Sequence, residues 1–374
     1  EFVLGTCHYI NWVQIGGAIS HPDQGKAIDM SQDIAQRTGV PDVDLKIHPV
    51  NGYGSPDLVR QCMNHYPLNA IMIYTDPRFW GWLFQMEHEI RQSIPIMYYN
   101  IWDSLPYPMW NQKYYDSVDA LFNISKQTVN IVKNVRSSYE DWQVTYIPHG
   151  INEQDYFPID KSYEKYDDFL KFRKDATQQK DKDFILFYNA RNIRRKLTGD
   201  IILAYSTFCD SLTPEQAKKC LLLLHCAPVD DNGTDLPEVA RNLAPNYDVA
   251  FSGGKLEREQ MNWLYNTADC SILISSNEGF GLMGAETLMC GVPLIVNVSG
   301  GMQDYCGFKK EDGSYLTVDD YTTEWGSNHD GRYKDHGEWV FPVWPSSRSL
   351  QGSPATPYIS DDRPDWQDVA IQIK

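Results

Sequence analysis

The chain alternates between short apolar runs and segments with helical spacing. The apolar runs have the length and the flanking turn residues of buried strands. They cover residues 2–5, 43–48, 68–75, 96–101, 120–124, 184–190, 220–226, 248–252, 270–274 and 294–298. Helical spacing covers residues 24–37, 57–65, 79–91, 166–173, 198–211 and 256–268, a segment that ends near residue 290, and the beginning of a helix at 365–374. This alternation predicts an α/β fold with parallel sheets and helices on both faces.

The most informative stretch is residues 275–293, which reads SSNEGFGLMGAETLMCGVP. It follows a buried strand, continues through a glycine-rich turn into a helix, and stops at Gly291, with Pro293 opening the next apolar run. A helix that begins directly after a strand presents unpaired N–H groups and a partial positive charge, which attract phosphate.

Two glutamates bracket this helix start. Glu278 precedes the helix and Glu286 lies eight residues later, which corresponds to about 12 Å along a helix axis. Gly279, Gly281 and Gly284 would let a ligand approach the backbone closely. This layout suits an elongated ligand with hydroxyl groups at both ends and phosphates between them, as in a nucleotide-sugar.

Glu-x7-Glu, with Gly-Phe-Gly after the first glutamate and Gly-Val-Pro closing the helix, resembles the signature of retaining GT-B glycosyltransferases, family 4 in particular. The resemblance implies that Glu278 holds hydroxyl groups of the transferred sugar and Glu286 those of the ribose. It also implies that the backbone amides of Gly279, Phe280, Gly281 and Leu282 face the sugar and the phosphates. The plainer alternative is an ordinary strand–helix unit with two solvated glutamates.

The same resemblance covers a basic segment after the strand at 184–190. Arg191 and Lys196 have the family's spacing for a cationic pair that clamps the donor diphosphate and stabilises the leaving group, although Leu197 stands where many members have glycine. Fixed cations suit this step because breaking a sugar–phosphate bond releases a doubly charged diphosphate. Arg194 and Arg195 are expected at the surface.

Further positions match the family more loosely. Gly16 and Gly17 resemble the loop near the donor diphosphate, and the turn at Ser252 and Gly253 resembles the one that contacts the nucleobase. Asp103 stands where many members have a His-Asp pair, here Trp-Asp, and is the candidate for hydrogen bonding or weak base work on the acceptor side. Asp76 and His149 have simpler readings as structural residues at a strand end and a turn.

These motifs predict a GT-B architecture with two Rossmann-like domains facing a central cleft. The expected parts are an acceptor-side domain over 1–150, a linker over 151–183, and a nucleotide-sugar-binding domain over 184–374 with an irregular insertion at 307–360. The last helix would cross back to the first domain, and the chain is expected to have been cut short there.

Composition narrows the partners. The chain has 374 residues, 22% of them charged and 42% hydrophobic, which is globular. Its net charge of −17 disfavours a broad nucleic-acid-binding face and simple attachment to anionic membranes. Eight cysteines without a Cys-x-x-Cys pair indicate reduced thiols in a cytoplasmic protein. The sequence contains no run of about 18 apolar residues, so no transmembrane helix is expected.

The sequence therefore predicts a retaining hexosyl- or pentosyltransferase that moves a sugar from a UDP-, GDP- or ADP-sugar to an acceptor hydroxyl. Neither a cofactor nor a metal ion is required, and no acidic metal cluster is visible. A glycan is the favoured acceptor. Because the chain also resembles glycosyltransferases of viral and phage-like sequences, a hydroxymethylated base in DNA is an alternative. A non-catalytic nucleotide-sugar-binding module is the other.

Overall fold

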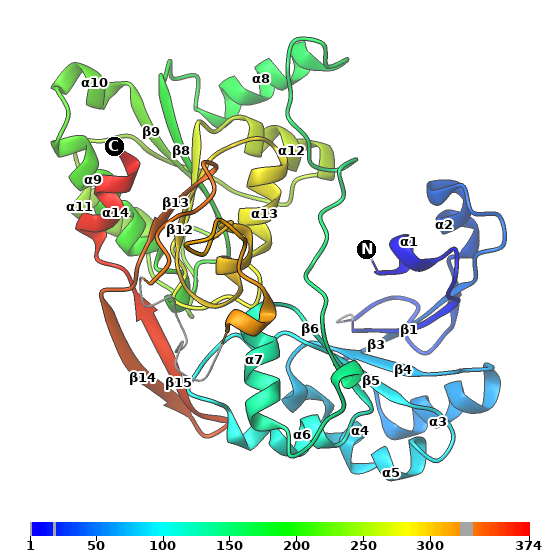
Figure 1. The fold of residues 1–374 in the computed structure, drawn as a ribbon. Coiled ribbons are helices and arrows are strands. Elements are labelled where there is room, and N and C mark those ends of the chain that lie inside the picture. The colour runs from blue at the N-terminus through cyan, green and yellow to red at the C-terminus, as the bar shows by residue number, and fades with distance from the viewer. Residues whose placement is uncertain (1, 18–19, 322–331) are drawn as a thin grey trace. The chain divides into compact units, whose positions relative to one another are not determined.

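The structure is a computed structural model that describes residues 2–17, 20–321 and 332–374 (Figure 1). The chain divides into two compact units. Unit 1 comprises Glu1–Asn100, Trp110–Phe122 and Arg136–Thr145, and unit 2 comprises Ile101–Met109, Asn123–Val135 and Tyr146–Lys374. Unit 2 therefore includes three segments from the first 150 residues (101–109, 123–135 and 146–150) as well as the whole expected linker. This differs from the division at 150 and 183 expected from the sequence.

Unit 1 contains two small sheets. The first has the order β1-β3-β2, with β1 (Trp12–Gly17) parallel and β2 (Ile28–Asp29) antiparallel to β3 (Leu45–Val50). The second has the order β4-β5-β6-β7, made of β4 (Ile71–Tyr74), β5 (Ile96–Asn100), β6 (Ala120–Asn123) and β7 (Val144–Tyr146). The helices are α1 (Phe2–Thr6), α2 (Ser31–Thr38), α3 (Pro56–His65), α4 (Gly81–Gln85), α5 (Glu87–Ile90) and α6 (Gln112–Asp116), with short 3₁₀ turns at Pro77–Trp80, Met109–Asn111 and Asp141–Gln143.

Several expectations for unit 1 were wrong in detail. Residues 2–5 lie in a helix rather than a strand, because so short an apolar run fits either. The helix expected over 24–37 begins only at Ser31, since Gly25 has a φ of 83° and β2 pairs with β3. The helix expected over 79–91 is broken at Met86, where ψ is 10°.

Unit 2 is built on one six-stranded sheet with the order β10-β9-β8-β11-β12-β13 (Figure 1). Every adjacent pair is parallel. The strands are β8 (Phe184–Asn189), β9 (Cys220–His225), β10 (Val249–Ser252), β11 (Cys270–Leu273), β12 (Leu294–Asn297) and β13 (Val340–Val343). In this doubly wound order, the strands after β8 are added first on one side of it (β9, β10) and then on the other side (β11, β12, β13). Ligands of such sheets bind at the carboxyl ends of the strands, at the point between β8 and β11 where the strand order switches.

Both faces of this sheet are buried, which explains the nearly continuous apolar runs in the sequence. Alternate residues of β8 and β9 point into two separate cores, with Leu186 and Leu222 on one side and Phe187 and Leu223 on the other. The helices of unit 2 are α7 (Lys126–Val135), α8 (Tyr166–Ala176), α9 (Thr198–Asp210), α10 (Pro214–Lys218), α11 (Leu236–Leu243), α12 (Arg258–Asn266), α13 (Leu282–Met289) and α14 (Trp366–Ile373), with 3₁₀ turns η4 (Arg194–Lys196), η5 (Gly300–Tyr305) and η6 (Val318–Asp320).

The stretch at 307–360 is more regular than the sequence suggested. It contains β13, which completes the main sheet, and most of an antiparallel hairpin formed by β14 (Ser347–Ser353) and β15 (Thr356–Arg363) (Figure 1). Its residues 322–331 lie outside the described part of the chain. The helix expected from residue 365 is α14, and the side chain of Asp365 caps it.

Candidate functional site

The candidate site lies at the point between β8 and β11 where the strand order of the unit 2 sheet switches. Strands β8 and β11 are neighbours there, with Leu186 opposite Cys270. The loop after β8 carries the basic segment with Lys196, and the loop after β11 carries Glu278. Residues from the two motifs are 82 positions apart in the chain, and the parallel sheet brings them together.

Glu278 is the centre of this arrangement. Its Oε1 accepts a hydrogen bond from Lys196 Nζ, and its Oε2 lies 3.2 Å from Arg195 Nη1. Burial raises the pKa of a carboxyl group, but Lys196 and Arg195 outweigh burial here and hold the pKa of Glu278 below its ordinary value. Burial also lowers the pKa of Lys196, against the attraction of Glu278. One buried carboxylate facing two cations leaves positive charge for an anionic ligand.

Arg195 was expected at the surface, and its side chain is 45% exposed. The sequence did not indicate its contacts: besides facing Glu278, Nη1 donates to the backbone oxygen of Asn277 at 2.6 Å. The backbone oxygen of Arg195 accepts from the N–H of Ser276. These contacts tie the basic loop to the loop that carries Glu278. Sequence reasoning missed Arg195 because the family's spacing pointed to Arg191.

Asp103 belongs to the same electrostatic group and to the same unit. Burial raises the pKa of its carboxyl, with Glu278 adding to the rise and Arg195 opposing it. Its Oδ1 accepts a hydrogen bond from Ser104 Oγ at 2.9 Å, and its backbone oxygen accepts from Gln127 Nε2. The structure thus brings Asp103, Lys196 and Glu278 together, as the sequence placed them in one site.

Arg191 is placed differently. Its guanidinium pairs with Asp230, with Nε 3.0 Å from Oδ2, and the side chain is 62% exposed. No ion pair between Arg191 and Glu278 occurs in the described part of the chain. Exposed ion pairs are worth about 0–1 kcal/mol, so Arg191 could exchange Asp230 for a phosphate at little cost.

The glycines of the motif serve the protein's own packing. A Cβ on Gly279 would lie 2.7 Å from the backbone oxygen of Ile101, and one on Gly284 would lie 2.5 Å from the Tyr305 hydroxyl. Only Gly281 also needs glycine for its backbone, with a φ of 81° where α13 begins. We had expected these glycines to admit a ligand. At Gly279 and Gly284 the space is taken by neighbouring protein atoms.

The beginning of α13 has no side-chain cap at Gly281. The N–H of Gly284 bonds to the backbone oxygen of Gly281 at 2.9 Å, whereas the geometry of an α-helix gives the N–H groups of Leu282 and Met283 no partner within the helix. Leu282, at the first helical position, is 44% exposed. Phe280 is buried and packs edge-on against His149 and Tyr305. The amides from Gly279 to Leu282 therefore belong to a turn fixed by packing.

Glu286 lies on α13 and is held by tyrosines. It accepts a hydrogen bond from the Tyr265 hydroxyl, which in turn accepts from Asn189 Nδ2 at 2.9 Å. A hydrogen bond also links it to Tyr156. The sequence gave no sign of the two tyrosines, because they come from the linker and from α12.

The remaining predicted residues form no hydrogen bond or ion pair with Glu278, Lys196 or Arg195 among the described residues. Ser252 ends β10 and its hydroxyl is 3.2 Å from His225 Nδ1, while a Cβ on Gly253 would meet nothing within 4 Å. Gly16 and Gly17 are in unit 1 and form the end of β1 rather than a loop after the first strand. A Cβ on Gly17 would lie 2.7 Å from the Gly52 backbone oxygen.

Two other aspartate and histidine positions have structural partners. Asp76 caps the turn that follows β4 and forms an ion pair with Arg78. His149 packs on Phe280. Among residues 2–17, 20–321 and 332–374, no three or more His, Cys, Asp or Glu side chains are grouped to hold a metal ion. Within the same ranges no helix has the length and apolar character needed to cross a membrane.

One family model matches the part of the chain that carries Lys196 and Glu278. Residues 169–317 match the model of the family described as glycosyl transferases group 1. An uncharacterized glycosyltransferase of Methanocaldococcus jannaschii is 24% identical over 190 residues, which are 51% of this chain and 45% of that protein. The matched region therefore spans less than half of the relative's length.

Solved structures show the fold. HepE of Anabaena, in complex with UDP and glucose, aligns with a TM-score of 0.58 at 14% identity. The alignment covers 91% of this chain and 78% of the HepE chain. The trehalose-6-phosphate protein of E. coli, bound with UDP-2-fluoro glucose, aligns with a TM-score of 0.55 at 11% identity over 78% of this chain and 85% of its own chain. Sucrose-phosphate synthase from Thermosynechococcus elongatus has a TM-score of 0.55 at 17% identity and covers 79% and 72%.

The match and the fold agree with the geometry of the site. Both glutamates, the basic segment and the doubly wound sheet fall within the matched residues, apart from the edge strand β13. The chain thus has the α/β, GT-B fold with parallel sheets, and its residues 169–317 match the model of glycosyl transferases group 1.

Proposed function

We propose that the protein is a retaining glycosyltransferase, similar to family 4, which moves a sugar from a nucleotide-sugar to an acceptor hydroxyl. The observation that carries the proposal is the cluster of Glu278, Lys196 and Arg195 beside the uncapped start of α13. Two cations and a row of backbone amides converge there with one carboxylate, which suits a sugar joined to a diphosphate.

In the proposed reaction, the bond between the anomeric carbon and the β-phosphate oxygen breaks while the acceptor oxygen bonds to the same carbon. The acceptor proton passes to the departing phosphate oxygen on the same face of the sugar, so the configuration is retained. Lys196 and Arg195 stabilise the charge that develops on this oxygen, and Arg191 joins them by leaving Asp230. Such donors typically contribute 10²–10³-fold each to turnover.

The carboxylates position the two ends of the donor. Glu278 binds hydroxyl groups of the transferred sugar, and Glu286, held by Tyr265, binds the ribose. Ser252 and Gly253 provide backbone for the base. Asp103, whose pKa is raised by burial, orients the acceptor hydroxyl.

UDP-glucose is the first donor to test, because two of the similar structures contain UDP with glucose or UDP-2-fluoro glucose. A screen of UDP-, GDP- and ADP-sugars would measure thermal stabilisation and slow hydrolysis of each donor. We expect one nucleotide-sugar to stabilise the protein and to be hydrolysed. Stabilisation by none of them would contradict the proposal.

A matched pair of variants separates catalysis from binding. Glu278→Gln keeps the size of the side chain but removes its charge, so turnover should fall by about 10²-fold or more, while the nucleoside diphosphate alone should still bind. Glu257→Gln, at an exposed helix start in the same unit, is the control. Equal turnover in the Glu278→Gln variant and the wild type would remove Glu278 from the mechanism.

The acceptor and the compartment complete the proposal. We propose that the acceptor is a glycan. We also propose a cytoplasmic location, since all eight cysteines are free, buried thiols, and such thiols persist best in a reducing compartment. Transfer of labelled sugar to a glycan mixture, compared with duplex DNA containing hydroxymethylated bases, distinguishes the two acceptors. Label in the DNA alone would favour the phage-like alternative.

A further inference from the structure

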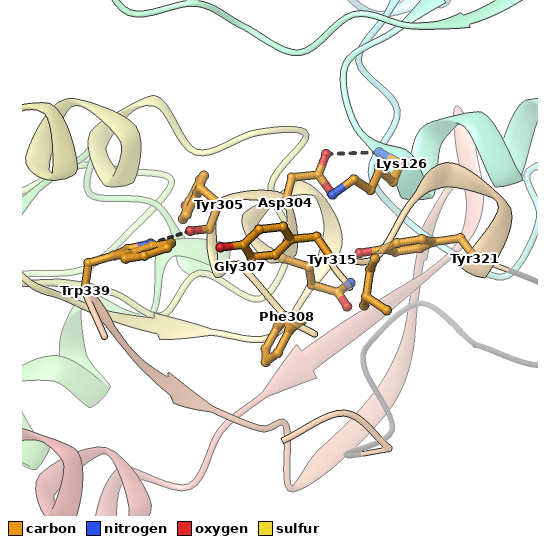
Figure 2. Close-up of a pocket in the computed structure, with 10 residues that line it drawn as sticks. Lys126, Asp304, Tyr305, Gly307, Phe308, Tyr315, Tyr321 and Trp339 are labelled. Atoms are coloured by element: carbon orange, nitrogen blue, oxygen red, sulfur yellow. Dashed lines mark hydrogen bonds between the residues drawn. The ribbon is translucent and has the colours of Figure 1, made fainter. Parts of the chain in front are cut away.

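Unit 2 contains a cavity lined by residues that the proposed transfer mechanism does not use. Its volume is about 240 Å³, and its walls come from α7, η5 and the segments around Phe308, Tyr315 and Trp339 (Figure 2). That is below the range of about 300–1,000 Å³ typical of sites for drug-sized ligands, so the cavity would hold a ligand of about one ring.

The walls of the cavity are aromatic. Tyr315 and Trp339 line it and remain 57% and 44% exposed, although both are large enough to be buried in a core. The indole N–H of Trp339 donates to the backbone oxygen of Tyr305 at 2.8 Å, which fixes the plane of the ring (Figure 2). Rigid rings with an apolar face suit the C–H face of a sugar.

Three buried oxygens of the lining residues have no hydrogen-bond partner among the described residues: Gln303 Oε1, Asp304 Oδ1 and the hydroxyl oxygen of Tyr305. The first two can only accept hydrogen bonds. Gln303 is only 2% exposed, and its Nε2 is already used by Gln127 and Gly300. The other oxygen of Asp304 accepts from the backbone N–H of Lys126 and from the Tyr146 hydroxyl. Each unpaired buried acceptor costs about 1–3 kcal/mol, so a ligand that donates to both would recover that energy.

The charges of the lining favour a neutral ligand. Lys126 and Asp304 both line the cavity and carry opposite charges that attract each other, so neither an amine nor an anion gains a net electrostatic advantage. An apolar ligand would leave the acceptors of Asp304 and Gln303 unpaired. A neutral ring with several hydroxyl groups can donate to Asp304 and Gln303, accept from Lys126 and pack on the aromatic walls.

We propose that this cavity is a binding site for one neutral sugar ring, formed by Gln303, Asp304, Lys126, Tyr315 and Trp339 and separate from the Glu278 site. It stands independently of the transferase reaction. One contact connects the two places: the Tyr305 ring borders the cavity, and its hydroxyl lies against Gly281 and Gly284 at the start of α13. A sugar at this site would thus lie next to the helix proposed to bind the donor.

The test uses the full chain carrying Glu278→Gln, which disables the proposed donor site for a free sugar. Binding of glucose, galactose, mannose and N-acetylglucosamine is measured by saturation-transfer NMR, with glucosamine and glucuronate as charged probes. We expect at least one neutral sugar to bind in the millimolar range, which corresponds to about −4 kcal/mol, and both charged sugars to bind at least tenfold more weakly.

Two substitutions assign the binding to the cavity. Asp304→Asn and Trp339→Ala should each weaken it at least tenfold, and Trp142→Ala, at an exposed tryptophan of unit 1, should leave it unchanged. The proposal is overturned if no neutral sugar gives a signal, if glucuronate or glucosamine binds best, or if Asp304→Asn, which keeps the shape of the side chain, binds as well as its parent.

Discussion

Asp304 offers the sharpest quantitative test of the structure, through the replacement Asp304→Asn. Burial raises the pKa of Asp304 from 3.8 to about 6, against the opposing effects of Lys126 and of the Tyr146 hydroxyl. At 1.36 kcal/mol per pKa unit, keeping this carboxylate ionised in the folded protein costs about 3 kcal/mol. Asparagine carries no charge and can still accept both hydrogen bonds now made to Oδ2.

The sign of the pH dependence follows from the raised pKa. Between pH 4 and pH 6 the folded protein binds more protons at Asp304 than the unfolded chain does, so the wild type loses stability as pH rises through this window. Above pH 6 the loss is complete. We therefore expect Asp304→Asn to be more stable than the wild type by about 1–3 kcal/mol at pH 8, because the new amide N–H₂ offsets part of the gain. The advantage should shrink towards pH 4.

The assay is urea unfolding of both proteins at several values between pH 4.5 and pH 8. Other titrating groups contribute equally to the two proteins, so the difference between them isolates Asp304. Lys126 and Tyr146 also face Asp304. Burial raises the pKa of the neighbouring Tyr305, Cys306 and Tyr321 above their ordinary values, so none of these three titrates in this window. A variant that is less stable than the wild type by the same amount at every pH would refute the reasoning.

Two further predictions use matched residues. Arg195→Ala should reduce turnover by about 10²-fold. Arg191→Ala should reduce it as much only if Arg191 leaves Asp230 for the diphosphate. Measuring the turnover of both variants in parallel therefore decides whether both arginines act. Gly301→Ala should unfold the protein at a markedly lower temperature, because its Cβ would lie 1.9 Å from the Gly279 backbone oxygen. Gly253→Ala, with open space around it, should melt like the wild type, and similar melting of both glycine variants would contradict the packing described for the turn.

The sequence predicted the sheet of unit 2 well because parallel strands are buried on both faces. Runs such as 220–226 therefore have no polar interruptions, and β9 was found within one residue at its end. Unit 1 was harder to predict. Its first strands are short and partly exposed, so their hydrophobic periodicity is weak. The left-handed φ of 83° at Gly25 and the pairing of β2 with β3 prevent the helix that the periodicity of residues 24–37 predicted from starting before Ser31.

The candidate site residues came from short motifs, each within one segment of the chain. Glu278 and Lys196 were singled out by the family's spacing after a strand, and the structure shows that the two strands, β8 and β11, are neighbours. Arg195 and Tyr265 could not be found in this way, because their roles depend on side-chain directions set by contacts distant in sequence. The turn at η4 shows this plainly: Leu197 takes a φ of 55°, a left-handed conformation that favours glycine, and so directs the cations before it.

The division of the chain bears on how the proposed site works. Asp103 comes from a segment expected in the first domain, yet Ile101–Met109 packs as part of unit 2. The backbone oxygen of Ile101 occupies the space above Gly279, and Gln127 holds the backbone of Asp103. Asp103, Lys196 and Glu278 are therefore positioned by the packing of one compact unit. A substitution that loosens this packing, such as Gly279→Ala, should disturb the donor and acceptor sides of the reaction together.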